Sequence, residues 1–485
     1  MLINAELLLQ YQRCKRRPFL DTHGDNIQRN VTHELLMKVQ QDKVTHRQSV
    51  LANLAYHQPD FPSGNWEAGA AATIELMQQG VDIIHRGVVL ANYNEYTLLS
   101  RPDLLVKQPG TSIFGEWFYV PVDIQLGKRP KQEYQVIAAF HAEILGVLQE
   151  VTLAEAWLIL RNQDSTYVVD LDKWTPQMLN ILTDYTAVIQ TPAAPEVFIA
   201  RQKCNLCHWY NHCYEVAKSQ QHLSLLPGVT PIRYTQLQEL SITTLDALAQ
   251  TNHSILENLI GFDTEVASKL IVQAQSVLTA QPLVLPYALP GENLTFTAPI
   301  ELYFDIEAQP DLNLNYLLGV LVVDRQANTE QFHSFLAETP EQEALIWQQF
   351  LDLVWQYPQA PIYHFCAYEV DTVKKLGRLY RTPYTSVGPL LNRFVDIYEQ
   401  LTQSVALPIE SYALKAIARW LGFEWRDQEA SGAKCIYWYD QWLEIGDRTL
   451  LELIQRYNED DCRATLKVKD WLVEFFQTED AKKFA

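Results

Sequence analysis

The pattern of hydrophobic and polar positions divides the chain into three blocks. Residues 1–219 mix helical periods with strand-like runs such as EWFYVPVDIQL and AWLILR. Residues 220–284 show only short helical periods, and the proline-rich stretch QPLVLPYALPGENLTF follows them. In residues 290–485, the strand-like runs ELYFDIEA and YLLGVLVVD precede helices that alternate with shorter apolar runs. We therefore predict an α/β multidomain protein with an α/β domain at each end and a helical domain between them.

The last predicted helix carries an acidic residue on its apolar face. The residues of this apolar stripe follow one another at steps of three or four: Tyr457, Asp461, Ala464, Val468 and Leu472. A carboxylate that faces a core is costly unless a partner or a metal ion holds it. We therefore expect Asp461 to have a specific partner or a metal ligand role.

Two further carboxylates, Asp305 and Glu307, lie two residues apart at the end of the strand-like run IELYFDIEA. The alternation of a β-strand places both on one face, opposite the aliphatic residues of the run. Like charges this close repel one another unless a cation lies between them. We therefore predict a cation site here, with a solvent-facing strand end as the alternative.

Glu369 is a further acidic residue that is predicted to face inward, and it lies in the predicted helix of HFCAYEVDTVKKLGRLY. It shares a helical face with Val373 and Leu376, whereas Asp371 falls on the polar side. Taken alone, Glu369 suits a helix start, where a carboxylate complements the helix dipole. The pattern therefore predicts that Glu369 faces inward and Asp371 faces outward.

The acidic residues on inward faces of this domain are Asp305, Glu307, Glu369 and Asp461. Hard oxygen ligands in this number suit Mg²⁺ or Mn²⁺, and a pair of such ions serves in-line displacement at phosphorus. One ion activates a water molecule as hydroxide, and the other stabilises the leaving 3′ oxygen. These residues therefore predict a phosphoryl-transfer site with two divalent ions.

The stretches FDIE, HFCAYE and YNEDD, in this order, resemble the three motifs of the DEDD exonucleases, whose domains have an RNase H-like fold. Tyr457 and Asp461 match the Tyr-x-x-x-Asp form of the third motif, which the proofreading domains of family B polymerases typify. The resemblance implies that Asp305 bridges both metal ions and that Glu307 and Asp461 complete the ligation. It also implies that Tyr457 orients the attacking water.

The second motif departs from the usual pattern. Glu369 stands where the proofreading enzymes usually have Asp, and its longer side chain would reach a metal ion directly or through water. The stretches SYALKAIARWLGF, residues 411–423, and FVDIY also resemble this group of enzymes. In FVDIY we expect Asp396 to have a structural role.

A tight cluster, KCNLCHWYNHCYE, gives Cys204, Cys207 and Cys213 the spacing C-x2-C-x5-C, and Cys14 lies near the N-terminus. A two-residue gap suits one metal centre better than a disulfide. The odd total of seven cysteines also argues against a disulfide framework. We therefore predict a metal centre, either iron–sulfur or zinc with a histidine of this stretch as a ligand, and buried thiols are the alternative.

One distant N-terminal cysteine followed by C-x2-C-x5-C resembles the iron–sulfur clasp of RecB-like nucleases, in which a [4Fe–4S] cluster ties the two ends of the domain together. The resemblance implies a cluster in residues 1–219 with the ligands Cys14, Cys204, Cys207 and Cys213. We expect the remaining cysteines, Cys366, Cys435 and Cys462, to be ordinary small hydrophobic residues.

RecB-like domains of the PD-(D/E)xK class carry a helical His, an Asp, a D/E-x-Lys strand and a Gln-x-x-x-Tyr helix. The matching positions here form a degenerate nuclease site: His46, Asp103, Asp123 and Gln125. Gln125 stands where the catalytic Lys belongs, and Arg47 where the family often has Glu. A neutral amide cannot provide the cation that the scissile phosphate needs. We therefore expect this domain to bind DNA or hold the architecture without cutting, with residual metal binding left open.

The middle block resembles tandem helix-hairpin-helix units, which present backbone N–H groups to phosphates. Ser241 stands where the first hairpin usually has glycine, and Gly261 is retained in the second. A purely structural helical spacer is the alternative. The full order of domains resembles a family of bacterial RecB-like nucleases along almost the whole chain.

Net charge and hydropathy limit the classes of binding partner and the location that we expect for this protein. A net charge of −20 argues against nonspecific coating of nucleic acid, although RCKRRPF, GKRPK and KKLGRLYR are candidate pieces of a basic groove or else solvated surface. No run of about 18 apolar residues is present, so we expect no membrane span. The N-terminal stretch has its charge after its apolar residues, the reverse of a secretory signal, so we expect a cytoplasmic protein.

The leading hypothesis is a metal-dependent 3′–5′ exonuclease that acts on DNA, or on RNA, through two Mg²⁺ or Mn²⁺ ions in the C-terminal domain. A second hypothesis is a nuclease that works from the N-terminal RecB-like site. A third is an iron–sulfur, nucleic-acid-binding scaffold protein with inactive nuclease domains. The sequence predicts neither protein partners nor an oligomeric state.

Overall fold

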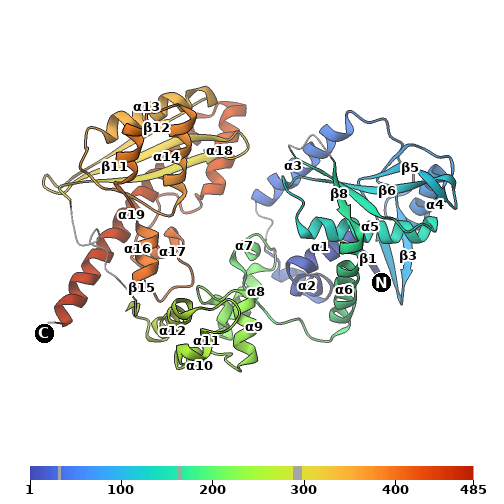
Figure 1. Ribbon diagram of the computed structural model, residues 1–485, viewed down its shortest axis with the longest axis horizontal. Coiled ribbons are helices and arrows are strands. Elements are labelled where there is room, and N and C mark those ends of the chain that lie inside the picture. The colour runs from blue at the N-terminus through green and yellow to red at the C-terminus, as the bar shows by residue number, and fades with distance from the viewer. Residues whose placement is uncertain (31–33, 162–165, 288–297, 484–485) are drawn as a thin grey trace. The chain divides into compact units, whose positions relative to one another are not determined.

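The computed structural model describes residues 1–30, 34–161, 166–287 and 298–483. The chain forms two compact units, Met1–Val216 and Ala217–Ala485, each with helices and β-sheet (Figure 1). The division into three domains stays a prediction. Most of the predicted proline-rich linker lies outside the described residues. None of the helices in the described ranges combines the length and the hydropathy that a membrane span requires.

The first unit is built on a mixed sheet with the strand order β2-β5-β6-β7-β8. Its strands are β2 (Ile83–His85), β5 (Leu104–Ser112), β6 (Gly115–Gln125), β7 (Glu155–Leu160) and β8 (Tyr167–Asp170). Because β6 and β7 run parallel, they need a crossover connection, and α5 (Gln132–Gln149) provides it. The helix α5 is buried along most of its length because it packs on this sheet and is also contacted by α1 (Ala5–Arg13) and α6 (Leu171–Gln190).

A smaller sheet and several helices complete the first unit. The sheet has the order β1-β4-β3, with β1 (Leu2–Asn4), β4 (Tyr96–Ser100) and β3 (Val89–Tyr93). The helices are α2 (Arg16–His23), α3 (Glu34–Leu51), α4 (Trp66–Gln78), α7 (Arg201–Cys204) and α8 (Tyr210–Ser219), the last of which crosses the unit boundary. Contacts between α3 and β6 bring helical residues to the strand that carries Asp123.

The second unit contains a sheet with the order β12-β11-β10-β13-β14. Its strands are β10 (Ile300–Gln309), β11 (Leu314–Asp324), β12 (Thr329–Leu336), β13 (Ile362–His364) and β14 (Phe394–Asp396). The central strand β10 pairs antiparallel with β11 and parallel with β13. The predicted alternation of β10 is confirmed, because Phe304 stacks on Phe350 of α13 (Glu343–Val354) and Glu301, of the opposite face, bonds Lys469 of α19 (Arg448–Lys483). The acidic face of β10 therefore meets α19.

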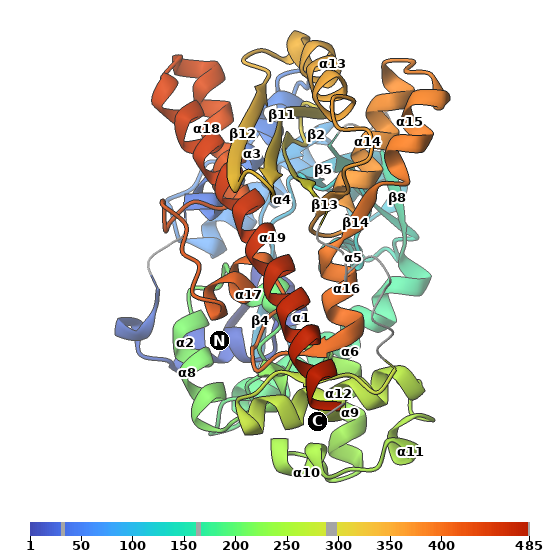
Figure 2. The same ribbon diagram turned by 90° about the vertical axis from the view of Figure 1, so that its left-hand side faces the viewer.

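The helix α19 is a single helix of 36 residues that contacts β10 and β11 and extends well beyond the sheet (Figure 2). Its predicted apolar stripe is confirmed as buried: Tyr457, Ala464, Val468 and Leu472. The other helices of this region are α14 (Tyr368–Leu379), α15 (Tyr384–Leu391), α16 (Ile397–Ser404), α17 (Leu414–Trp420) and α18 (Gly432–Ile445). Because α16, α17 and α18 all pack on α19, its stripe is covered along much of its length.

The start of the second unit is helical. Its helices are α9 (Pro231–Glu239), α10 (Leu245–Ala249), α11 (His253–Leu256) and α12 (Thr264–Thr279). Ser241 and Gly261, the two positions where hairpin glycines are expected, have φ of 61° and 83°. The block is joined to the sheet region, because β9 (Leu283–Val284) pairs with β15 (Val405–Ala406) and Gln273 Nε2 donates to the Leu407 carbonyl at 2.6 Å.

Candidate functional site

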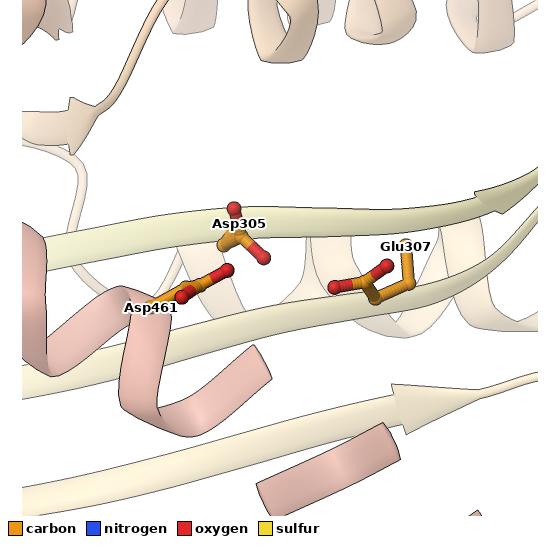
Figure 3. Close-up of side chains that lie close together, drawn as sticks. All are labelled: Asp305, Glu307 and Asp461. Carbon is orange, nitrogen blue, oxygen red and sulfur yellow. The ribbon is translucent and has the colours of Figure 1, made fainter. Parts of the chain in front are cut away.

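Three carboxylates from β10 and α19 meet in the second unit, and we call them the acidic centre: Asp305, Glu307 and Asp461. One ligand oxygen of each lies within 4.8 Å of the others. Figure 3 shows the Asp305 and Asp461 carboxylates side by side, with the Glu307 carboxylate directed toward them. Asp305 is half-buried, while Glu307 and Asp461 are 6% and 9% exposed. The packing of α19 on β10 thus joins two distant stretches of sequence in one buried group of oxygen donors.

Burial and mutual repulsion disfavour the charged forms of the acidic centre. Burial raises the pKa of Asp461 to about 7, although hydrogen bonds from Trp425 and Tyr457 favour its carboxylate form. Burial also raises the pKa of Asp305 and of Glu307 well above their ordinary values, and the charge of Asp461 raises both further. Three hard oxygen donors in this environment fit a divalent cation, because its charge would offset both burial and repulsion.

Asp461 has the partners that a carboxylate on an apolar stripe requires. Trp425 Nε1 donates to Asp461 Oδ1 at 2.7 Å, and the Trp425 side chain is itself buried. Lys415 adds positive charge that favours ionised Asp461. The neighbouring Asp460 faces another partner, because Arg426 Nε donates to Asp460 Oδ1 at 2.7 Å. Adjacent carboxylates of α19 therefore have separate surroundings.

Tyr457 lies one helical turn before Asp461 and is 7% exposed. Burial raises the pKa of the Tyr457 hydroxyl far above its ordinary value, and the charge of Asp461 adds to the increase. The hydroxyl therefore stays protonated at neutral pH and is able to donate a hydrogen bond. Lys415 Nζ lies 4.8 Å from the centre of the Tyr457 ring, at the distance of a cation–π contact that holds the ring in place.

Glu369 is buried beside the acidic centre but is not one of the three carboxylates that meet there. It lies in the first turn of α14 with 4% exposure, whereas Asp371 is exposed, so the predicted inward and outward faces are confirmed. Glu369 Oε2 lies 3.4 Å from His364 Nδ1. Burial raises the pKa of Glu369, and its charge contributes to the raised pKa of Asp305. Glu369 therefore influences the centre electrostatically from its contact with His364.

The sequence reasoning missed Asn458, which is fully buried and touches the acidic centre. Asn458 Nδ2 donates to Asp305 Oδ2 at 2.6 Å and so fixes one carboxylate oxygen. Gly319 of β11 provides the space, because a Cβ atom there would lie 1.6 Å from Asn458 Oδ1. The available signals were the amide in YNEDD and the glycine inside the strand-like run YLLGVLVVD, where a glycine marks a close approach.

Asp396 has structural contacts. Its Oδ1 accepts a hydrogen bond from the Cys366 backbone N at 3.0 Å and caps α16 by accepting from the backbone N of Tyr398 at 2.9 Å. Cys366 has a φ of 79°, a region that non-glycine residues rarely adopt. The Asp396 hydrogen bond therefore stabilises a strained turn just before Glu369.

The four cysteines predicted as a cluster all lie in the first unit. They come from both ends of its sequence: Cys14 after α1, Cys204 at the end of α7, Cys207 in the following turn and Cys213 in α8. Burial raises the pKa of the last three thiols, that of Cys213 to about 11, and the charge of Cys14 adds to each increase. His208, a histidine of this stretch, has its Nε2 2.7 Å from Asp21 Oδ1.

The positions of the degenerate nuclease site come from α3, from β6 and from Asp103, the residue before β5, and we call this region the Asp103 centre. Arg47 Nε lies 2.6 Å from Asp103 Oδ1, and the Ile124 backbone N donates to Asp103 Oδ2 at 2.7 Å. Asp123 Oδ1 lies 3.7 Å from His141 Nε2, and burial raises the pKa of Asp123 to about 8. The Asp103 carboxylate is therefore bound on both sides by groups of the chain itself.

His46 and Gln125 complete the Asp103 centre. Burial lowers the pKa of His46, and the charge of Arg47 lowers it further, whereas Asp103 and the Gln125 backbone act in the opposite direction. Gln125 ends β6 two residues after Asp123 and presents a neutral amide. The structure thus brings all four predicted positions to one region, with Arg47 beside them.

Residues 302–473 match the family described as the RNase H superfamily. The C-terminal region therefore has an RNase H-like fold, a class that points to a nuclease-like hydrolase with a nucleic-acid substrate. RNase H-like domains use divalent metal ions, and the acidic centre has the donors to bind them.

Two further comparisons are less informative. No curated protein matches the chain. A solved structure titled "Crystal structure of SSO0001" is similar over 44% of this chain and 84% of its own length, with 11% identity and a TM-score of 0.24, which is too low to establish a shared fold.

Proposed function

We propose that this protein is a metal-dependent 3′–5′ exonuclease that hydrolyses phosphodiester bonds of DNA at the acidic centre. The observation that carries the proposal is the meeting of three carboxylates, two of them buried and one half-buried, with one oxygen of each within 4.8 Å of the others, in a domain of RNase H-like fold. Carboxylates in this arrangement require positive charge to ionise together. The order of FDIE, HFCAYE and YNEDD along the chain supports the exonuclease class and the 3′–5′ direction.

The residues proposed to hold two Mg²⁺ or Mn²⁺ ions are Asp305, Glu307 and Asp461. When bound, such a pair activates water and stabilises the leaving 3′ oxygen. Asp305 would be one of the ligands, and the Asn458 amide keeps its carboxylate in one orientation. Trp425 does the same for Asp461 through its indole N–H.

The hydroxyl of Tyr457 is proposed to orient the attacking water. The hydroxyl keeps its proton at neutral pH and donates it in a hydrogen bond to Asp461, so its oxygen is left to accept a hydrogen bond from the water. Glu369 is proposed to assist through a water molecule, since it lies outside the group of three and contacts His364. Loss of Glu369 should therefore cost less activity than loss of Asp305.

The test is Mg²⁺- or Mn²⁺-dependent release of nucleotides from DNA by the wild-type protein and by Asp305→Asn and Asp461→Asn. Each substitution removes a charge with little change of shape, and we expect turnover to fall by about a thousandfold or more, as for the loss of a group that stabilises the transition state. Asp460→Asn is the matched control, because it changes the adjacent carboxylate of α19, which faces Arg426. Full activity in Asp461→Asn would refute the proposal.

The direction of degradation and the preference for DNA over RNA are tested separately. An oligonucleotide labelled at its 5′ end should give a ladder of products shortened stepwise from the 3′ end. Matched DNA and RNA strands should show faster degradation of DNA. Immediate release of the 5′ label as a mononucleotide would contradict the direction, and faster degradation of RNA would contradict the sugar preference.

We also propose that residues 1–219 form a RecB-like domain with a [4Fe–4S] cluster on Cys14, Cys204, Cys207 and Cys213. Support comes from the C-x2-C-x5-C spacing and from the charge of Cys14, which adds to the raised pKa of each of the other three thiols although it comes from the opposite end of the unit. Three of these thiols have raised pKa values without a metal, and iron would favour their thiolate forms. His208 Nε2 lies 2.7 Å from Asp21 Oδ1, so only its Nδ1 atom is left as a zinc ligand in the alternative zinc centre.

The cluster is tested on protein purified without oxygen. We expect broad visible absorbance and bound iron in the wild-type protein and the loss of both in Cys207→Ser. Cys366→Ser, which changes a thiol of the other unit, is the control and should keep the absorbance. Stoichiometric zinc in place of iron would reject the cluster.

A further inference from the structure

The Asp103 centre of the first unit is occupied by a cation of the chain itself. Arg47 lies against one oxygen of Asp103 and the Ile124 backbone N against the other. Asp123, with its pKa raised to about 8 by burial and then by the charge of Asp103, is mostly protonated at neutral pH. A divalent cation bound here would have to displace Arg47 and remove the proton of Asp123.

Two further arginines directly follow strands of the two sheets of this unit. Arg86 follows β2, and its backbone N donates to the Asp103 carbonyl at 3.0 Å. Arg101 follows β4, and its guanidinium lies over the Trp66 ring at 5.6 Å. Burial lowers the pKa of Arg101 and the charge of Arg86 lowers it further, so these two like charges repel each other. A bound anion would remove this repulsion.

Among the buried atoms of this centre that make no hydrogen bond with any residue that the structure describes are three nitrogen atoms, His46 Nε2, His85 Nε2 and Arg101 Nε, and one oxygen atom, Asp123 Oδ2. His85 pairs across the sheet with Leu104, the residue after Asp103. Burial lowers the pKa of both histidines, and Arg47 lowers it further whereas Asp103 raises it. Buried polar atoms almost always have a partner. Since an anion also favours the protonated form of histidine, all three nitrogen atoms become donors once an anion is present.

We propose that the Asp103 centre binds a phosphate group of nucleic acid, without metal and without cleaving it. Arg47, Arg86 and Arg101 outnumber the two carboxylates of this centre, Asp103 and Asp123, and guanidinium donors match phosphate oxygens in geometry. Only the choice of nucleic acid as the carrier of the phosphate rests on the proposed function of the second unit. In that role the first unit contributes to the binding of nucleic acid and not to its hydrolysis.

The test measures binding of a fluorescein-labelled single-stranded DNA oligonucleotide to the full-length Asp461→Asn protein in EDTA, by fluorescence anisotropy. Adding Arg101→Ala or Arg86→Asn should weaken binding about tenfold, as expected for the loss of a hydrogen bond to a charged group. Each should also lower the slope of log affinity against log salt by about one. Asn is chosen at position 86 because Arg86 has a φ of 54°, which Asn tolerates.

Lys173→Ala is the matched control. Lys173 also lies over an indole, that of Trp174 at 5.0 Å, but it stands next to β8 at the opposite edge of the sheet from β2. Its variant should bind as tightly as the parent. Unchanged affinity and salt slope in Arg101→Ala and Arg86→Asn would overturn the proposal. Binding that needs Mg²⁺ and is lost in Asp123→Asn would also overturn it, in favour of a residual metal site.

A small substrate separates this proposal from the proposed function. The p-nitrophenyl ester of thymidine 5′-monophosphate carries one phosphate for the acidic centre to hydrolyse. In a chain with Asp461 intact, Arg101→Ala and Arg86→Asn should hydrolyse it at the wild-type rate and show a raised KM only for oligonucleotides. A wild-type protein that hydrolyses no substrate would refute the exonuclease, whereas the binding comparison would still decide on the phosphate site.

Discussion

The carboxylate of Asp305 is oriented by an amide, and the amide depends on the absence of a side chain on the next strand. Asn458 Nδ2 reaches Asp305 Oδ2 because Gly319, which lies opposite Asp305 on the neighbouring strand β11, leaves room for the carboxamide. The Asp305 carboxylate is therefore oriented by a neutral amide. Because the amide carries no charge, it does not replace a cation at the acidic centre. An acidic neighbour in that place would add to the repulsion.

Gly319→Ala tests this contact. The new Cβ atom would lie 1.6 Å from Asn458 Oδ1, so the amide must move away from Asp305. We expect a loss of about 1–3 kcal/mol in the free energy of unfolding, as for other overpacked sites, together with weaker activation by Mg²⁺. Denaturant unfolding and metal titration of activity measure the two effects. Gly432→Ala, where an added Cβ meets nothing within 4 Å, should change neither.

Asp123 gives the stability of the first unit a pH dependence. Its pKa is raised from 3.8 to about 8, so the folded state holds the proton more tightly than the unfolded state does. Stability therefore falls as pH rises between these values, because the folded state must then lose a proton that it prefers to keep. Asp123→Asn removes this penalty. We expect its thermal stability relative to wild type to increase with pH up to about 8 and then to level off.

Thermal melts over a pH series measure this effect. Asp172→Asn, at an exposed position at the start of α6, controls for the loss of one charge and should give a constant difference from wild type. If the melting temperature of Asp123→Asn differed from that of wild type by the same amount at every pH, Asp123 would be ionised in the folded protein. The net positive charge of the Asp103 centre would then be smaller.

At the scale of the elements, α19 and β10 are joined by charge as well as by apolar packing. Lys469 of α19 and Glu301 of β10 are both almost completely buried, and Lys469 Nζ donates to Glu301 Oε1 at 2.7 Å. Arg325 Nε donates to the other oxygen of Glu301 at 2.7 Å and the same guanidinium bonds Asp470. This network fixes the register of α19 on β10, and that register places Asp461 opposite Asp305.

Lys469→Met should be strongly destabilising. It keeps most of the side-chain volume but leaves Glu301 with a buried charge that only Arg325 offsets, so we expect a loss of about 3–5 kcal/mol in the free energy of unfolding. Lys467→Met, at an exposed position on the same helix, should lose less than about 0.5 kcal/mol. Denaturant unfolding of both variants makes the comparison, and equal stabilities would show that the network contributes only weakly.

At the scale of the whole molecule, the two compact units carry separate proposed centres. The cysteines and the Asp103 centre lie in Met1–Val216, and the acidic centre lies in Ala217–Ala485. Each unit has its own hydrophobic core. Loss of a cofactor from one unit should therefore affect the stability of that unit alone.

Calorimetry of Cys207→Ser and Asp461→Asn tests this independence. We expect two thermal transitions, one for each unit. Cys207→Ser should lower the free energy of unfolding of the first unit by several kcal/mol, because the metal-linked stability is lost, and Asp461→Asn should leave that transition unchanged. Hydrolysis of the nitrophenyl ester should survive in Cys207→Ser. A single transition that moves in both variants would contradict independent units.

Local patterns predicted much of the C-terminal region. The alternation in IELYFDIEA and the helical period from Tyr457 to Leu472 predicted the buried faces that the structure confirms. The same reasoning placed Glu369 inward but did not show that it stays outside the group of three carboxylates. Its distance from them depends on the turn at Cys366 and on the contact with His364, and neither follows from a helical period.

The sequence by itself determined which side chains of each strand and helix share a face, because those periods depend only on local backbone geometry. It also determined that acidic and thiol groups would be candidates for metal chemistry, because those residue types carry the donors. Only the tertiary structure decided that Asn458 holds Asp305, that Trp425 holds Asp461, and that Arg47 lies against Asp103. These contacts join segments that are far apart in the chain, and their register is set by the packing of whole elements against one another.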